Sequence, residues 1–271
     1  MTRRLYIILI AILIIATACS DNNVHNGTHI VGSQLPNLHA EFAEDTRTYI
    51  EEGNHLRWHE GDLITVFYGN TLNQKYMFDG QTGDNSGTFS HIVDGSLGTG
   101  NPLNHIYAIY PYNKRIKIDD INQEITITIP DTQPYETNSF GKGANIMIAK
   151  TANTSIRFLS FKNCCGYIKL QLYGPTTVSR IELRGNNNET LTGVASIYVA
   201  EDGIPHMNVV NGVSTITITC DRGIELNSSA ESPTEFWFTV PPTTFKSGIS
   251  VTIYDTNGNS YTQSTTNEID I

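Results

Sequence analysis

Two histidines come nearest to a spacing that could do chemistry. His55 and His59 are four residues apart and flank Trp58, so on an extended strand both would lie on one face. A zinc site needs a third and a fourth ligand, and the nearby Asp62 directly follows Gly61 in a turn. We therefore expect exposed polar histidines here and no metal site.

Carboxylates are paired once, at Asp119 and Asp120, in a hydrophilic turn. A glycosidase needs two carboxylates that face each other across a cleft, whereas adjacent residues usually point apart. The Asx-rich turns at Asp84 and Asp255 would need further oxygens for calcium, which takes six or more. The sequence has no G-x-S-x-G elbow and no phosphate-binding loop. We expect no enzymatic activity and no cofactor.

Three cysteines follow the amino-terminal Cys19, namely Cys164, Cys165 and Cys220. An odd number cannot all pair within one chain, and a bond between adjacent cysteines is rare and strained. Two interpretations stay open. Cys220 could bridge to one of the adjacent pair in an oxidising compartment, or all three are buried free thiols that act as small apolar side chains.

The first nineteen residues have the pattern of an export signal. Two arginines precede an apolar run at residues 5–15, and small residues come directly before Cys19. An eleven-residue helix rises about 16 Å, too little for a bilayer core of about 30 Å. Ala16-Thr-Ala-Cys19 resembles a bacterial lipobox, which implies cleavage after residue 18 and acyl chains on Cys19. The alternative is an ordinary signal peptide whose junction contains a cysteine by chance.

Acyl chains would make an effectively permanent anchor, because each buried methylene contributes about 0.8 kcal/mol. No second apolar run approaches membrane-spanning length, so acylation is the membrane attachment that we expect. The formal net charge is −10, and no Lys/Arg cluster interrupts the acidic sequence. Such a surface repels phosphate backbones, so we expect no nucleic-acid partner.

The remaining chain has the patterning of short β-strands. Apolar, β-branched and aromatic residues alternate with polar ones, and turn residues recur about every ten positions. No segment has the periodicity of an amphipathic helix, and this pattern favours a sandwich over a parallel α/β sheet. The expected strands are residues 63–68, 74–78, 87–90, 106–110, 124–129, 145–149, 156–161, 166–173, 178–183, 191–199, 214–220, 235–240 and 249–254.

We predict an all-β protein with two tandem β-sandwich domains. The stretch 131–152 is the best boundary, because prolines, glycines and Asn/Thr residues interrupt the strands there. The predicted parts are a signal peptide at 1–18, a flexible polar tether at 19–40, and sandwiches at 41–150 and 151–271.

The order of several strand-and-turn motifs resembles the fimbrillin family, the Mfa-like fimbrial lipoproteins of Bacteroides and relatives. The motifs are Thr46-Arg-Thr, Trp58-His-Glu-Gly-Asp62, Tyr107-Ala-Ile-Tyr-Pro-Tyr112, Phe161-Lys-Asn-Cys-Cys-Gly166, Leu191-Thr-Gly193 and Phe238-Thr-Val-Pro-Pro242. This resemblance implies transthyretin-like Greek-key sandwiches, lipid anchoring at the outer membrane, exposure on the cell surface or fimbrium, and a role as a pilus subunit in adhesion.

The resemblance also implies how subunits join. An arginine-specific protease removes an amino-terminal strand, and a donor strand from another fimbrial subunit fills the groove. Arg47, in an acidic stretch, is the preferred cleavage residue, ahead of Arg57 beside Trp58. Either residues 261–271 are the donor, or the protein is a tip, anchor or accessory subunit. A ligand on a host or bacterial surface would be a further partner.

The alternative function is a surface glycan-binding lipoprotein that does not polymerise. Thirteen tyrosines and two tryptophans are enough for a sugar platform, and Tyr107, Tyr110 and Tyr112 cluster together. However, Trp58 and Trp237 lie within strand-like runs, so we expect both to be core residues.

Overall fold

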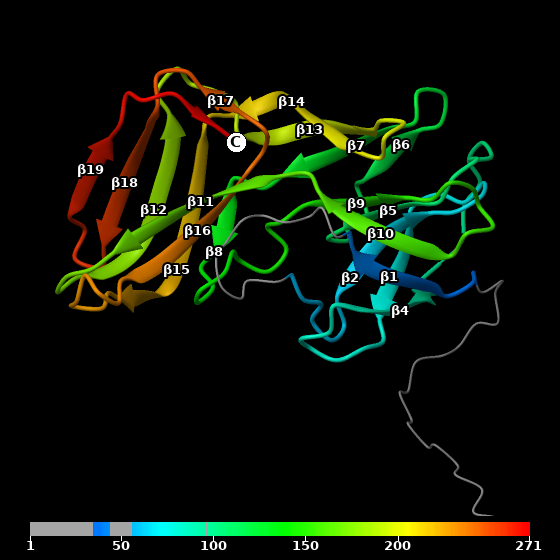
Figure 1. Ribbon diagram of the computed structural model, residues 1–271, viewed down its shortest axis with the longest axis horizontal. Coiled ribbons are helices and arrows are strands. Elements are labelled where there is room, and N and C mark those ends of the chain that lie inside the picture. The colour runs from blue at the N-terminus through cyan, green and yellow to red at the C-terminus, as the bar shows by residue number, and fades with distance from the viewer. Residues whose placement is uncertain (1–34, 44–55, 96) are drawn as a thin grey trace, which may run out of the picture. The chain divides into compact units, whose positions relative to one another are not determined.

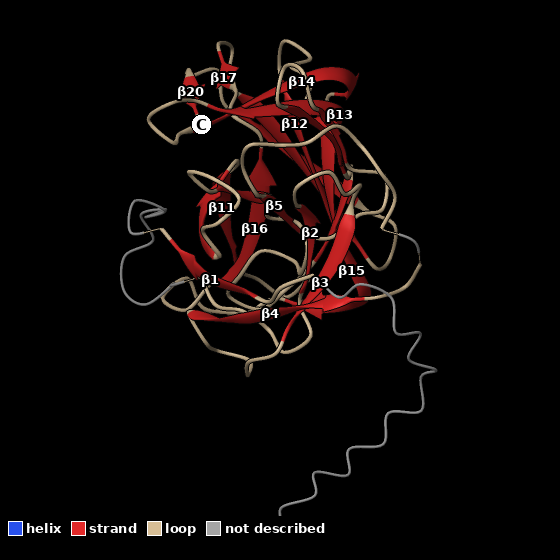
Figure 2. Cartoon of the chain, turned by 90° about the vertical axis from the view of Figure 1, so that its right-hand side faces the viewer, coloured by secondary structure: helices blue, strands red, loops and turns tan. Residues whose placement is uncertain are grey.

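The computed structural model describes residues 35–43, 56–95 and 97–271. This part of the chain consists of strands and loops without a helix (Figure 2), which confirms the all-β prediction. It therefore offers no helical segment that could cross a membrane.

Seven strands form a closed barrel (Figure 1), in which each strand pairs with two neighbours. In order around the barrel they are β1 (Leu38–Phe42), β10 (Phe158–Asn163), β9 (Met147–Lys150), β5 (Tyr107–Tyr110), β2 (Leu63–Phe67), β3 (Gln74–Phe78) and β4 (Ser86–Ile92). β4 pairs with β1 and closes the ring.

Strand β5 shows why these short segments are so apolar. Successive side chains point to opposite faces of the strand. All four residues of β5 are buried because an apolar cluster covers each face. Ala108 and Tyr110 belong to the cluster inside the barrel. Tyr107 and Ile109 point outward into a second cluster, shared with another sheet.

That other sheet has four strands and covers the outer face of the barrel. Its strands, in spatial order, are β14 (Pro205–Val213), β13 (Thr192–Val199), β7 (Glu124–Ile129) and β6 (Lys117–Asp119). The alternation of β7 places Ile125, Ile127 and Ile129 in the shared cluster, and β13 adds Ala195 and Ile197.

A third apolar cluster lies between a five-stranded and a two-stranded sheet. The larger sheet contains β19 (Ser260–Ser264), β18 (Ile249–Asp255), β12 (Thr177–Gly185), β15 (Thr215–Glu225) and β8 (Thr132–Pro134). The smaller one pairs β11 (Gly166–Leu172) with β16 (Thr234–Val240), and a separate pair joins β17 (Thr244–Phe245) to β20 (Ile269–Asp270). Ile181 and Ile218 from the larger sheet meet Phe236 and Phe238 from the smaller one.

Strand pairs join segments from both sides of the predicted boundary at residue 150. β7 pairs with β13, with Ile129 opposite Gly193. β8 pairs in parallel with β15, with Gln133 opposite Ile218. The division into 41–150 and 151–271 stays a prediction, and any division has to accommodate these two pairings and the place of β10 between β1 and β9 in the barrel. Strand β1 begins at Leu38, within the stretch expected to be tether.

Candidate functional site

Strand β1 lies between two neighbours from distant parts of the sequence. It runs parallel to β10, with Ala40 opposite Leu159, and antiparallel to β4, with Leu38 opposite Phe89. Beyond the ladder, the amide of Ala43 donates to the carbonyl of Phe161 at 2.9 Å. This one short strand therefore closes the barrel.

Alternate side chains of β1 point into the barrel. Leu38 and Ala40 are fully buried, and the ring of Phe42 stacks on Trp58 with 4.6 Å between ring centroids. Trp58 is itself only 1% exposed and meets the rings of Phe89 and Phe161 edge to face. The strand thus contributes a large, a small and an aromatic side chain at alternate positions.

The segment that leads into β1 is held by two side chains. The hydroxyl of Tyr76 donates to the carbonyl of Pro36 at 3.1 Å, and the amide of Leu35 donates to Nδ1 of His91 at 3.4 Å. Nε2 of His91 lies 3.1 Å from Oε1 of Gln74. Burial lowers the pKa of His91, which favours the neutral imidazole that can accept from Leu35.

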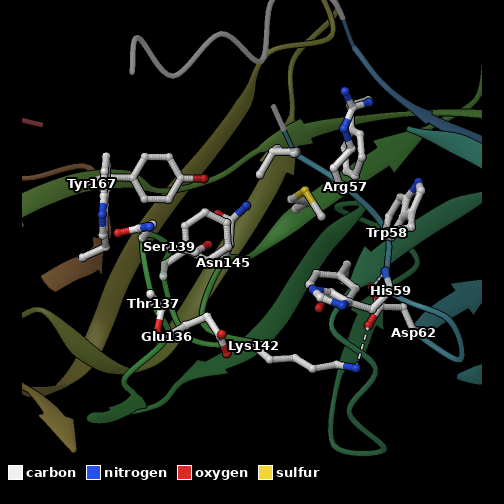
Figure 3. Close-up of a pocket in the computed structure, with 18 residues that line it drawn as sticks. Arg57, Trp58, His59, Asp62, Glu136, Thr137, Ser139, Lys142, Asn145 and Tyr167 are labelled. Carbon is white, nitrogen blue, oxygen red and sulfur yellow. Dashed lines mark hydrogen bonds and ion pairs between the residues drawn. The ribbon is translucent and has the colours of Figure 1, made fainter. Parts of the chain in front are cut away.

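A cleft of about 380 Å³ opens where β1 ends. Its walls come from β1, from the loop that precedes β2, from the 136–145 segment between β8 and β9, and from β11 and β16. Figure 3 shows Tyr167 and Ser139 on one side of the cleft and Arg57 and Trp58 on the other. The side chain of Lys142 extends between these sides toward Asp62.

Asp62 is the buried charge of this cleft. A tight turn places it there: its Oδ2 accepts from the amide of His59 at 2.8 Å, and its own amide donates to the carbonyl of His59 at 2.9 Å. Gly61 within the turn has φ +73°, which glycine adopts at little cost. Asp62 is 3% exposed, and its Oδ1 lies 3.3 Å from Nζ of Lys142. Burial and the nearby Asp62 carboxylate raise the pKa of Tyr110.

Asn145 is the second buried polar side chain of the cleft. It is 1% exposed, and its amide nitrogen donates to Oδ1 of Asn163 at 2.9 Å. Its own Oδ1 accepts no hydrogen bond from the part of the chain that the structure describes.

The residues that the sequence suggested as possible site residues do not gather at one place in the structure. Cys19, Arg47 and His55 lie outside the described residues. His59 is exposed at the cleft, and no group of three or more metal-ligating side chains occurs within the described ranges. Asp119 and Asp255 each accept hydrogen bonds from their own turns, from Ile121, Asn122, Asn257 and Asn259.

The three cysteines and the two tryptophans are buried in the structure, as expected of core residues. Cys164, Cys165 and Cys220 are buried free thiols, and burial raises the pKa of each. Trp58 and Trp237 are 1% and 4% exposed, so neither forms a surface platform, although both line the cleft.

The sequence did not mark the polar residues of the cleft as a site. Asp62 was expected only as a turn residue, and Lys142 and Asn145 lie in the stretch expected to be a domain boundary. The Gly61-Asp62 turn was the one visible signal, because it places a carboxylate directly before the largely buried strand β2.

Residues 261–271, one of the two alternatives for the donor question, contain residues of two strands that are paired within the chain itself. β19 forms the edge of the five-stranded sheet, with Tyr261 opposite Ile253, and β20 pairs Ile269 with Phe245. All five side chains of β19 are exposed.

Three solved structures are similar to this chain. A candidate cell adhesion protein from Bacteroides ovatus has 15% identity and a TM-score of 0.48, over 88% of this chain and 90% of that one. A candidate cell adhesion protein from Bacteroides uniformis has 16% identity and a TM-score of 0.44, over 85% and 84%. The tip fimbrial protein Mfa3 from Porphyromonas gingivalis, with a C-terminal truncation, has 11% identity and a TM-score of 0.32, over 84% and 81%. No protein-family model and no curated protein matches the sequence.

Proposed function

We propose that this protein is a fimbrial subunit that mediates adhesion, and that before cleavage it is anchored to the outer membrane through acyl chains on Cys19. In this proposal the protein joins to other subunits by exchange of strand β1 for a strand of a neighbour. Cleavage after Arg47 prepares the exchange, because Arg47 comes five residues after the end of β1.

The position of β1 in the barrel is the observation that carries this proposal. After cleavage at Arg47 the strand would be held by its two backbone ladders, by its buried side chains and by the hydrogen bonds at Leu35 and Pro36. Its departure would leave unpaired amides and carbonyls on β4 and β10, together with an apolar slot between them. An extended donor strand satisfies both needs at once.

The slot defines what a donor strand has to carry. Leu38, Ala40 and Phe42 fill it, so a donor needs a large apolar residue, a small residue and an aromatic residue at alternate positions. A large side chain at the central position would overfill a fully buried site.

We propose that the donor comes from another subunit and that this chain acts as the acceptor. Residues 261–264 are exposed and polar apart from Tyr261, so they would bring little apolar area to the slot. Donation from one subunit to the next does not close on itself and therefore produces a filament, of which a subunit that only accepts forms one end.

An arginine-specific protease tests the proposal on the purified protein. We expect a new amino terminus at Thr48 together with SDS-resistant oligomers once donor subunits are present. Arg47→Lys should abolish both, whereas Arg57→Lys, a matched change at the exposed alternative, should alter neither. Cleavage after Arg47 without any oligomers would contradict the assembly role.

A further inference from the structure

The cleft beside β1 contains buried polar atoms that the protein itself does not satisfy. Oδ1 of Asn145 accepts no hydrogen bond from the described residues, although the side chain is 1% exposed. Oδ1 of Asp62 also lacks a hydrogen-bond donor among them, although Lys142 forms an ion pair with it and the hydroxyl of Tyr110 interacts with the same carboxylate. Because buried acceptors are normally paired, these two atoms indicate a ligand that donates hydrogen bonds.

The same cleft presents hydrogen-bond donors. The side chain of Lys142 is 57% exposed, and its ammonium group has three N–H donors, so it can donate to a ligand while it stays beside Asp62. Arg57 and Asn138 also line the cleft, and both are exposed. A ligand held here would therefore have to accept as well as donate hydrogen bonds.

The charges of the cleft cancel. Its lining contains the acidic Asp62 and Glu136 and the basic Arg57 and Lys142. The two basic side chains would repel a cationic ligand, and the two acidic side chains would repel an anionic one. A neutral ligand avoids both penalties.

Aromatic rings supply the apolar part of the walls. Phe140 and Tyr167 are half-buried and stack with a centroid distance of 5.0 Å and an interplanar angle of 6°. The ring of Phe42 is also half-buried at the opposite wall. Ring faces of this kind pack against the C–H face of a pyranose, while its hydroxyl groups reach polar partners.

We propose that this cleft binds a neutral saccharide, with Asp62 and Asn145 accepting from its hydroxyl groups and Lys142 donating to them. A sugar hydroxyl both donates and accepts, so a polyol fits the mixed lining, whereas an apolar ligand would leave the buried acceptors unpaired. The volume of about 380 Å³ falls in the range of small-ligand pockets, about 300–1,000 Å³. The proposal does not depend on strand exchange, because the cleft is formed with β1 in place.

Tryptophan fluorescence is a direct probe of this site. Trp58 and Trp237 are the two tryptophans of the chain, and both line the cleft. The purified protein is titrated with lactose, cellobiose and maltose, and in parallel with glucosamine and glucuronate as a cationic and an anionic sugar. We expect a saturable fluorescence change with at least one neutral disaccharide and weaker responses to the charged sugars.

Two variants link binding to the named side chains. Lys142→Gln is an exposed change that leaves the core intact, and Asp62→Asn keeps the shape of the buried group. Each should raise the dissociation constant at least about tenfold, the usual effect of losing a hydrogen bond to a charged group. Lys114→Gln, at an exposed lysine outside the cleft lining, is the matched control and should leave it unchanged.

The proposal is overturned if none of the three neutral disaccharides gives a saturable change. It is also overturned if the charged sugars bind more tightly than the neutral ones, or if Lys142→Gln binds as well as the unaltered protein.

Discussion

Gln133 is a single side chain that joins two sheets. It is 1% exposed, its Nε2 donates to the carbonyl of Thr239 at 2.8 Å, and its Oε1 accepts from the amide of Thr239 at 3.0 Å. The side-chain amide of Gln133 thus pairs with the backbone amide and carbonyl of Thr239 in β16, as a neighbouring strand would. The bond links β8, in the five-stranded sheet, to the smaller sheet that faces it.

Gln133→Leu should lower the free energy of unfolding by about 2–4 kcal/mol. The change leaves a buried amide and a buried carbonyl of Thr239 without partners, and each unpaired group costs about 1–3 kcal/mol. Urea denaturation measures the loss. The exposed Gln81→Leu is the control and should stay within about 0.5 kcal/mol. Equal effects of the two changes would show that the Gln133 bridge contributes nothing.

His91 should make the stability depend on pH. Burial lowers its pKa in the folded protein below the value of about 6.5 in an unfolded chain, and the charge of Asp94 acts in the opposite direction. The unfolded state therefore binds the proton more readily, and stability is lost as the pH falls from about 6.5 toward the lower pKa of His91 in the folded protein.

Unfolding in urea at pH 7.5 and pH 5 tests this dependence. The loss of stability between the two values should be larger in the unaltered protein than in His91→Gln, because the variant lacks the titrating group. The same loss in both proteins would exclude His91 as a source of the pH dependence.

Sequence reasoning predicted core residues better than polar ones. Trp58 and Trp237 were expected in the core because they lie within strand-like runs, and both are buried. The pairing of Asp62 with Lys142 joins residues eighty positions apart. No local pattern reports a contact of that kind.

At the scale of elements, adjacent residues of β1 point in opposite directions, one into the barrel and one to solvent. Ala40 is fully buried, whereas His39 is exposed and stacks on Phe158. Ala40→Leu should cost about 1–3 kcal/mol, because it adds volume to a filled barrel. His39→Leu should change stability by less than about 0.5 kcal/mol. Urea midpoints that move equally for both would contradict the inward packing of β1.

Strands rich in β-branched and aromatic residues could be predicted, and strands with mixed or few residues could not. β2, β7 and β16 lie where their β-branched and aromatic residues place them. β14 escaped prediction because it is an edge strand with exposed, mixed residues. β8 is only three residues long and contains a proline, and it is fixed by its partner β15 rather than by its own sequence.

At the scale of the whole molecule, the crossing pairs β1–β10, β7–β13 and β8–β15 should make the described part of the chain unfold as one unit. Each pair joins the segment before residue 150 to the segment after it. Calorimetry should give a single transition whose calorimetric enthalpy equals the van't Hoff enthalpy. Two separate transitions would instead support independent domains at 41–150 and 151–271.

A reversible lock on β1 tests the central claim most directly. His39 and Thr88 are opposite each other on β1 and β4, and the amide of His39 donates to β10 through the carbonyl of Arg157. The two residues thus form a non-hydrogen-bonded pair, whose Cα atoms lie about 4.5 Å apart, a separation that a disulfide can bridge. The double variant His39→Cys with Thr88→Cys would hold β1 in the barrel when oxidised.

The measurement compares SDS-resistant oligomers of this double variant, after cleavage by the arginine-specific protease in the presence of donor subunits, with and without reductant. We predict that the oxidised protein is cut after Arg47 yet stays monomeric, and that reduction restores the oligomers. The single variants should assemble in both conditions. Oligomers that form equally well with the lock closed would contradict assembly through release of β1.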